Sequence, residues 1–427
     1  MSLKPPLLLV FPLLICRLVI APAQNPGCDG IRYKQSVFAN VQKTSLQYAT
    51  AISQIGQTVS LVMDVYEPQG DTTSRRPVVV LEHGGSFIFG DKTDMTRWCQ
   101  LLAQRGYVAA SIQYRLYPVF VLGYPDSVAI MDAAFKAVGD LKAAVRFFRE
   151  DAATANQFRV DAQHIFIGGY SAGAVAALHA AYLDSTDVVP GFIQNIVHAN
   201  GGLNGNAGSA SNQSYSSAAS AVINMSGGLY RREWIGDGDM PMVSIHGTAD
   251  GTVPFLSGLA ANIAYLEGSG LLHQRAQQVG AWSYLKKIPG GGHTDIYDQV
   301  KYAPQVDNFW MRATALLEFM TCYVDNSPHL VSGSGEAPAP LPASEWFITP
   351  NPVRENHFAI QLPGSTSSVH IAVFDAAGHN VFQVNGAHDG QVLALPAGLP
   401  RGVYFVQVSD MERPESGVQT KQLLLLP

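Results

Sequence analysis

The stretch GYSAG at residues 169–173 decides the fold that this sequence predicts. It follows an apolar run over 163–168, which indicates a buried strand, and it precedes the small apolar residues 174–178, which indicate a helix. A Gly-x-Ser-x-Gly motif between a strand and a helix is typical of a strained turn that holds a serine nucleophile above the end of a sheet. Because Gly, Ser and Ala are common residues, the motif gains weight only if partners for Ser171 follow in the right order.

The composition is that of a large, loop-rich globular chain. Its 427 residues are 47% hydrophobic and 14% charged, which is enough for a core domain of about 300 residues and a smaller second domain. The net charge of −6 argues against nucleic acid as a partner, and no long basic run occurs.

The N-terminal residues predict a signal peptide over 1–23. Lys4 precedes an apolar run over 7–15, and the small residues 21–23 are suitable for cleavage. Because the run is short and is interrupted by Pro12, we expect no stable membrane span.

Segments of strand character alternate with helical segments along the chain. Apolar or alternating runs predict strands over 61–66, 77–81, 107–112, 163–168, 221–225, 242–246 and 282–288. Residues 93–105 and 126–148 predict helices, the second with Asp126 as its N-cap. This alternation predicts an α/β fold with a mostly parallel sheet that helices cover on both faces. Residues 200–217, rich in Gly, Asn, Ser and Ala, predict an exposed excursion that is either a lid or a surface loop.

Acyl transfer by a serine needs a base and a carboxylate that orients the base. Asp250 follows the strand predicted over 242–246 and would lie at the carboxyl edge of the sheet, where sites of α/β proteins are built. His293 follows the last predicted strand, and the three glycines before it allow its loop to bend toward Ser171. The alternatives are an aspartate that only stabilises a turn and a histidine of a surface loop.

Other acids and histidines lie near these candidates. Asp237 and Asp239 precede the strand instead of following it, so we expect them at the wrong edge of the sheet. His246 lies within the end of that strand and is predicted to be a packed or hydrogen-bonded histidine of the core.

An oxyanion hole is predicted directly after the strand over 77–81. Residues 83–86 read His-Gly-Gly-Ser, and glycines let the backbone approach a substrate closely. We expect the N–H groups of Gly85, Ser86 and Ala172 to point at the developing oxyanion, each contributing roughly 3 kcal/mol at the transition state. An ordinary glycine turn is the alternative.

These motifs, in this order, resemble those of the α/β-hydrolase superfamily, specifically its carboxylesterase- and lipase-like serine esterases. The segments that carry the resemblance are 83–85, 113–116, 169–173, 246–254 and 291–293. The resemblance implies an α/β-hydrolase catalytic domain over 24–326, with Ser171, Asp250 and His293 as the catalytic triad and with no cofactor and no metal. Two positions depart from the common pattern: Ser86 replaces a third glycine, and Tyr170 stands where Asp or Glu is common.

The three cysteines that follow the predicted cleavage point are Cys28, Cys99 and Cys322. An oxidising compartment favours one disulfide and one free thiol. In α/β-hydrolases the helices predicted to carry Cys99 and Cys322 cover the same sheet face, so the resemblance favours that pair. Pairing of Cys28 with either of the two is the alternative.

The C-terminal part has a different pattern. Residues 327–345 are rich in Pro, Ser and Gly and predict a linker. Beyond it, alternating runs separated by Gly and Pro predict a small antiparallel β-sandwich over 346–427. This part resembles the C-terminal sorting domain of type IX secretion cargo, which implies the secretion machinery as a partner and a secreted or cell-surface location. Whether the tail is cleaved stays open.

Together these features predict a secreted serine carboxylesterase. Its substrate would be a small-molecule or polysaccharide-linked ester, with acetyl or feruloyl esters of plant polysaccharide as candidates. A lipase or serine peptidase on the same fold is one alternative. A non-catalytic adhesion or binding protein is another, which the presence of every triad member argues against.

Overall fold

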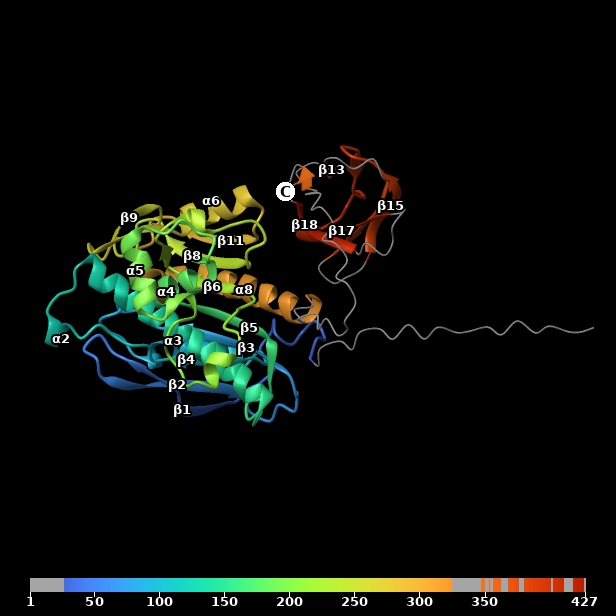
Figure 1. Cartoon of the computed structure of the whole chain (residues 1–427). Helices are drawn as coiled ribbons and strands as arrows, with labels where there is room; N and C mark the ends of the chain where they lie inside the picture. The colour runs from blue at the N-terminus through green and yellow to red at the C-terminus, as the bar shows by residue number, and fades with distance from the viewer. Residues whose placement is uncertain are drawn as a thin grey trace, which may run out of the picture.

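The computed structural model describes residues 27–324, 347–349, 353, 356–361, 368–375, 380–400, 402–410 and 418–425 (Figure 1). The predicted signal peptide over 1–23 and the predicted linker over 327–345 lie outside the described residues.

An eight-stranded sheet forms the centre of residues 27–324, in the order β1-β2-β4-β3-β5-β6-β8-β11. The pairs β1-β2 and β2-β4 are antiparallel, and the other neighbours are parallel. The strands are β1 (Val41–Ile52), β2 (Thr58–Pro68), β3 (Arg76–Glu82), β4 (Val108–Ile112), β5 (Val160–Tyr170), β6 (Val222–Met225), β8 (Met242–Gly247) and β11 (Ser283–Ile288). The mostly parallel sheet confirms the predicted α/β class, and each strand predicted for this part occurs within a few residues of its predicted place.

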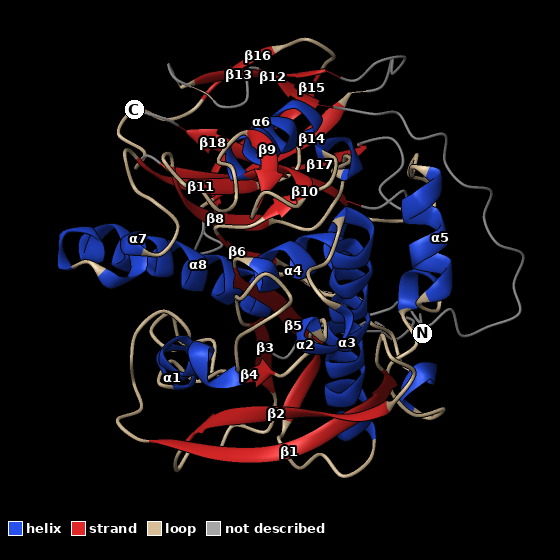
Figure 2. Cartoon of the chain, turned by 90° about the vertical axis from the view of Figure 1, so that its left-hand side faces the viewer, coloured by secondary structure: helices blue, strands red, loops and turns tan. Residues whose placement is uncertain are grey.

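Helices cover both faces of the sheet (Figure 2). On β3, Val78 and Val80 belong to the core cluster beneath α3 and α4, whereas Val79 and Leu81 belong to the cluster beneath α1 and α8. The apolar centre of β3, residues 77–81, is therefore buried on both sides, as the doubly covered sheet requires. The helices are α1 (Thr96–Ala103), α2 (Val119–Leu122), α3 (Ser127–Ala153), α4 (Ala172–Tyr182), α5 (Gly191–Ala199), α6 (Ser269–Val279), α7 (Asp295–Asp298) and α8 (Ala303–Tyr323), with short 3₁₀ turns η1 (Lys92–Met95), η2 (Gly202–Asn204), η3 (Asn212–Ser214), η4 (Arg232–Trp234) and η5 (Val300–Tyr302).

The predicted helices form with small differences. Asp126 caps α3 as expected, because its side chain accepts the N–H groups of Val128 and Ala129. The helix predicted over 93–105 is divided into η1 and α1. Within the described part of the chain, no helix is both long enough and apolar enough to cross a bilayer.

A second, three-stranded sheet combines one strand that precedes β8 with a hairpin that follows Asp250. It pairs β10 (Ala264–Gly268) with β7 (Gly228–Leu229) on one side and with β9 (Ser257–Ala260) on the other. The sequence did not predict this sheet, whose strands are too short to show a clear alternation. The hairpin β9–β10 lies on the same side of the molecule as α2 (Figures 1 and 2).

Among the described residues beyond 346, the strands form two antiparallel sheets, as predicted. Buried side chains of both sheets, among them Ile360, Ile371 and Val406, belong to one apolar cluster. One sheet has the order β12 (Phe347–Thr349), β13 (His357–Gln361) and β16 (Val392–Ala394), and the other β15 (Asn380–Ala387), β14 (Val369–Phe374), β17 (Gly402–Asp410) and β18 (Val418–Leu425).

The favoured disulfide prediction was wrong. Cys28 is bonded to Cys322, with a Cα–Cα distance of 5.7 Å, and Cys99 is a free, buried thiol. Cys99 faces the core beneath α1, and burial raises the pKa of its thiol. Cys322 lies at the end of α8, against which the N-terminal segment packs, for example through Lys34 and Glu318 at 3.3 Å. The helices that carry Cys99 and Cys322 cover the same sheet face, but this was not enough to predict their pairing. The segment that carries Cys28 lies nearer to the end of α8, and Cys28 therefore forms the disulfide with Cys322.

Candidate active site

Ser171 stands on the turn between β5 and α4 with φ of 54° and ψ of −119°. Its N–H donates to the carbonyl of Met225 at 2.8 Å, which ties the turn to β6. A Cβ on Gly169 would lie 2.5 Å from the carbonyl carbon of Gly173, and a Cβ on Gly173 would collide with the carbonyl of Glu82. The small residues of the motif are therefore required by close approach of the backbone, as the motif predicts.

The structure brings the three predicted residues together. His293 Nε2 lies 2.7 Å from Ser171 Oγ, and His293 Nδ1 lies 2.7 Å from Asp250 Oδ2. Asp250 follows β8 and His293 follows β11, so parallel strands deliver both side chains to the edge where β5 delivers the serine. In this chain of hydrogen bonds, Nδ1–H donates to the carboxylate, and Nε2 is free to accept the hydroxyl proton.

Asp250 is held as a carboxylate. Its side chain is fully buried, and its Oδ1 accepts the N–H groups of Thr252 at 2.8 Å and Val253 at 2.9 Å. Burial by itself raises the pKa of Asp250, but hydrogen bonds and charge from His246 and His293 outweigh it and hold the pKa well below its ordinary value. The negative charge is thus available to stabilise an imidazolium at His293.

His246 is the buried core histidine that the sequence predicted, but its contact with the acid was missed. Its Nε2 lies 3.0 Å from the carbonyl of Val253 and 3.2 Å from Asp250 Oδ2, and its Nδ1 lies 2.7 Å from Ser269 Oγ. The ring therefore fixes the loop that carries Asp250. The only signal in the sequence was its position four residues before the acid.

Tyr170 packs against His293. Its ring stacks on the imidazole of His293 at 5.3 Å between centroids, and its hydroxyl donates to the His293 carbonyl at 3.4 Å. The rings of Tyr170 and Tyr297 meet nearly at right angles, with centroids 5.1 Å apart, and Tyr297 Oη lies 2.7 Å from Ser226 Oγ. At this position the family resemblance led us to expect Asp or Glu, and Tyr170 instead gives the histidine loop an aromatic surface to pack against.

The predicted oxyanion loop begins at the end of β3. Ser86 and Phe87 have positive φ values of 55° and 61°, so the loop turns sharply next to Ser171. Ser86 and Ala172 line the same pocket as Ser171, whereas Gly85 is not among the lining residues. A Cβ on Gly85 would collide with the carbonyl of Phe89, which gives this glycine a steric role. The assignment of three N–H donors stays a prediction.

Glu82 precedes this loop and is fully buried. Burial, with a smaller contribution from the nearby charge of Asp140, raises the pKa of Glu82 well above its ordinary value. Burial therefore disfavours a negative charge on Glu82, directly behind a loop that is expected to bind an anion. No motif in the sequence pointed to Glu82.

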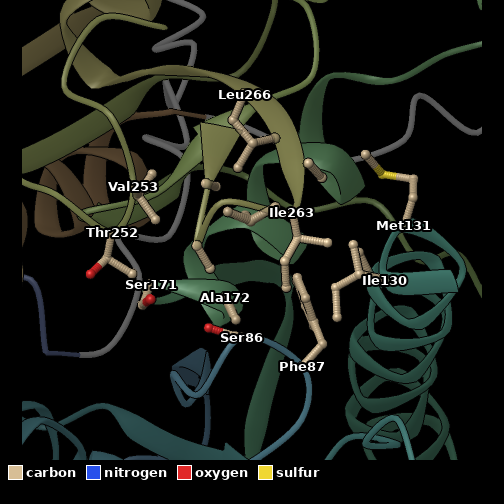
Figure 3. A pocket seen from close by; sticks show the side chains of 15 residues that line it. Ser86, Phe87, Ile130, Met131, Ser171, Ala172, Thr252, Val253, Ile263 and Leu266 are labelled. Carbon is tan, nitrogen blue, oxygen red and sulfur yellow. The ribbon is translucent and has the colours of Figure 1, made fainter. Parts of the chain in front are cut away.

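A pocket opens beside the serine (Figure 3). It contains about 520 Å³ of space, including the part that is open to solvent. Ser86, Ser171 and Thr252 lie at one end, and Ile130 and Met131 of α3 lie at the other. The lining residues are Ser86, Phe87, Ile130, Met131, Ala134, Ser171, Ala172, Val175, Thr252, Val253, Ala260, Ala261, Ile263, Ala264 and Leu266.

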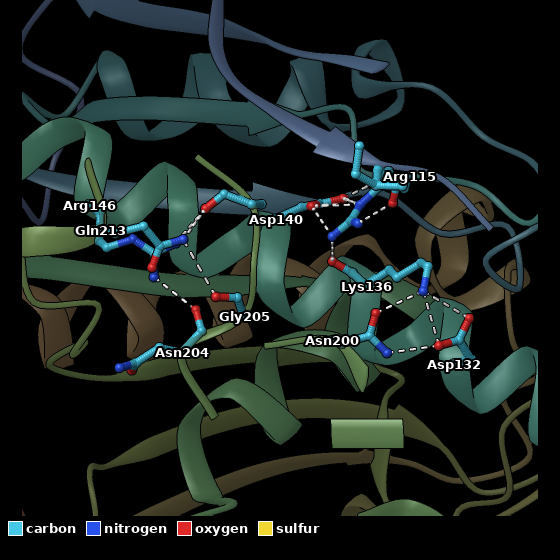
Figure 4. Close-up of polar contacts among 11 residues, drawn as sticks. Arg115, Asp132, Lys136, Asp140, Arg146, Asn200, Asn204, Gly205 and Gln213 are labelled. Carbon is cyan, nitrogen blue, oxygen red and sulfur yellow. Dashed lines mark hydrogen bonds and ion pairs between the residues drawn. The ribbon is translucent and has the colours of Figure 1, made fainter. Parts of the chain in front are cut away.

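The excursion over 200–217 is bound to α3 and does not line this pocket (Figure 4). Arg146 donates to the carbonyls of Asn204 and Ala207 and to Oδ1 of Asn212, each at 2.9 Å. Lys142 donates to the carbonyl of Leu203 at 2.5 Å. The segment is therefore a packed strap, and we call residues 200–217 the strap below.

Two family models match the chain. BD-FAE matches residues 63–230, and the Secretion system C-terminal sorting domain matches residues 348–423. One curated relative, the non-reducing polyketide synthase Preu3 of Preussia isomera, is 28% identical over 127 residues, which are 29% of this chain. The chain spans about 5% of the length of that relative.

The fold is also similar to solved structures of esterase 2 from Thermogutta terrifontis. The form phosphoramylated by tabun is 21% identical, covers 66% of this chain and 96% of its own, and has a TM-score of 0.47. The propionate-bound form is 21% identical, covers 64% and 95%, and has a TM-score of 0.46. By its sheet topology and its two family matches, the chain is an esterase-like α/β-hydrolase that carries a Secretion system C-terminal sorting domain, which indicates secretion or attachment to the cell surface.

Proposed function

We propose that the protein is a secreted serine carboxylesterase with Ser171, His293 and Asp250 as its triad. The observation that carries the proposal is the continuous chain of two 2.7 Å contacts from Ser171 Oγ through His293 to Asp250. Signal-peptide cleavage after residue 23 and a catalytic domain over 24–326 belong to the same proposal.

The geometry supports a two-step acyl transfer. His293 Nε2 takes the hydroxyl proton as Ser171 Oγ attacks the ester carbonyl, and Asp250 stabilises the resulting imidazolium. N–H groups of Ser86 and Ala172, with Gly85 as the third predicted donor, stabilise the tetrahedral oxyanion. The imidazolium then gives its proton to the leaving alcohol, which leaves the acyl group on Ser171. Water, activated by His293, attacks this acyl-enzyme, and the carboxylic acid and free serine are released.

The first prediction tests the nucleophile. Ser171→Ala should lower kcat for nitrophenyl acetate roughly ten-thousandfold, because it removes the hydroxyl that lies 2.7 Å from His293 Nε2 and is expected to carry the acyl intermediate. A fluorophosphonate probe should label the wild type and fail to label the variant. Ser257→Ala, which changes an exposed serine of β9, is the matched control and should keep full activity. Equal hydrolysis by the wild type and Ser171→Ala would disprove the proposal.

Export gives the protein access to polymeric esters, so acetyl and feruloyl esters of plant polysaccharide are the candidate natural substrates, and of the two the apolar pocket beside Ser171 favours the acetyl ester. The choice of plant polysaccharide rests on location and not on the chemistry of the site. Hydrolysis of acetylated xylan and methyl ferulate, measured beside simple nitrophenyl esters, distinguishes the two acyl groups.

One observation favours a lipase as a second candidate. Phe120 of α2 is 95% exposed and Tyr124, just beyond α2, is 80% exposed, and Val121 and Leu122 are exposed as well. This apolar segment begins beside the oxyanion loop, because the N–H of Tyr117 donates to the carbonyl of Phe87 at 2.7 Å. A lipase would show a steep rise in activity when its ester exceeds the solubility limit, whereas a carboxylesterase would saturate below that limit.

A further inference from the structure

We propose that the apolar pocket beside Ser171 is an acyl-binding site selective for aliphatic acyl chains, with α3 and the hairpin β9–β10 setting the accepted length. This inference rests on the proposed function, since it names the substrate class of the same site.

The position of the pocket identifies which half of the ester it holds. Ser86 and Ala172, whose N–H groups are expected to bind the oxyanion, belong to its lining, but His293 and Tyr170 do not. Because His293 must protonate the leaving alcohol, the alcohol has to depart on the side of His293. The group that stays on Ser171 therefore occupies the pocket, and that group is the acyl chain.

The walls of the pocket determine the chemistry of that chain. Beyond the hydroxyl groups of Ser86, Ser171 and Thr252 at its mouth, the lining side chains are apolar. At the far end, Ile130 and Met131 present only aliphatic and thioether surface. A feruloyl group would bury its phenol hydroxyl there without a side-chain partner, which is unfavourable. An aliphatic chain has no polar group to desolvate there, and each buried methylene makes the free energy of binding more favourable.

The hairpin forms one wall through a tight turn. The N–H of Ile263 donates to the carbonyl of Ala260 at 2.9 Å, and the two residues between them, Ala261 and Asn262, have φ values of 49° and 59°. The N–H of Ala261 donates to the carbonyl of Thr252 at 2.7 Å, and the N–H of Thr252 in turn donates to Asp250. Hydrogen bonds therefore connect this wall to the loop that carries the catalytic acid, so the pocket and the triad belong to one site.

The test uses nitrophenyl esters of increasing acyl length. For the wild type, kcat/KM should rise about fourfold per methylene from acetate to at least butyrate, and then fall when the chain exceeds the pocket. Ala134→Leu fills the pocket from α3 and should lower kcat/KM for hexanoate at least tenfold while acetate changes less than threefold. Met131→Ala should move the optimum to a longer chain. Ala129→Leu makes the same change on the same helix at a partly buried residue that does not line the pocket, and it should leave the series unaltered.

Three results would overturn the inference. The first is a chain-length series that Ala134→Leu and Met131→Ala both leave unchanged. The second is a shift seen only when the alcohol of a butyrate ester is lengthened, which would make the pocket an alcohol site. Hydrolysis of acetate that depends on Ser171 would still support the proposed function in either case, so the two failures are distinguishable. Methyl ferulate turnover at or above the best aliphatic ester would also contradict the inference.

Discussion

The strap over 200–217 and the hairpin β9–β10 are the two segments that depart most from the plain alternation of strands and helices, and they have opposite roles. The strap has the composition of a mobile lid, yet charged side chains of α3 bind its carbonyls and it does not line the pocket. The hairpin is short and inconspicuous, yet Ala260, Ala261, Ile263, Ala264 and Leu266 line the pocket. Composition therefore does not identify the segment that lines the pocket. Whether a segment lines the pocket depends on the part of the molecule against which it packs.

The largest effect on stability is expected for substitutions at the residues of α3 that bind the strap. Arg146→Ala should lower the free energy of unfolding by about 3 kcal/mol, because buried carbonyls of the strap lose their donor. Urea unfolding followed by tryptophan fluorescence measures the change. Arg149→Ala, whose bonds to Ser216 and Ala218 are exposed, is the control and should cost about 1 kcal/mol. If Arg146→Ala changed the acyl chain-length preference as strongly as a pocket variant does, the strap would affect the pocket and its contrast with the hairpin would be wrong.

The next effect concerns pH. Burial, with a smaller contribution from Arg146, lowers the pKa of Lys142 to about 8. An unfolded lysine has a pKa near 10.4, so between pH 8 and about 10.4 the unfolded chain binds a proton that the folded chain has released. In that window Lys142 makes the free energy of unfolding rise with pH. Below pH 8 the free-energy cost of burying its charged ammonium group stays constant.

Lys142→Met should remove this slope. Relative to the wild type, the variant should lose about 2 kcal/mol of unfolding free energy between pH 8 and pH 10, as urea unfolding at the two pH values would measure. The exposed Lys287→Met is the control and should keep the slope of the wild type. Parallel curves for the wild type and Lys142→Met would show that the strap does not hold this lysine in a buried site.

The smallest effect is expected at the turn of the hairpin. Ala261 has a φ of 49°, a conformation that costs an alanine about 1 kcal/mol and a glycine very little. Ala261→Gly should therefore raise the free energy of unfolding by about 0.5 kcal/mol and shift the thermal midpoint upward. Ala260→Gly also removes one methyl group, but its residue lies in a strand, so it should destabilise by a similar amount. Stabilisation by both variants would assign the effect to something other than backbone strain.

Local sequence was sufficient to predict the positions of much of the candidate site. The glycines around Ser171 could be predicted because close backbone approach tolerates no Cβ there. The places of Asp250 and His293 could be predicted because parallel strands end at one edge of the sheet. The contacts of Tyr170 and His246 could not, since both depend on loops that meet only after folding. The same limit explains the disulfide, where the N-terminal segment decided the partner of Cys322.

By itself, the sequence determined the α/β class, the order of the triad candidates and the antiparallel tail. These features follow from hydrophobic period, from glycine at positions without room for a side chain, and from strand direction, all of which are local or depend on chain order. The tertiary structure alone decided that the strap is fixed to α3 and that the hairpin β9–β10 lines the pocket beside Ser171. Whether a loop covers a site depends on the buried donors and apolar surfaces that it meets, and those are contributed by residues far away in the chain.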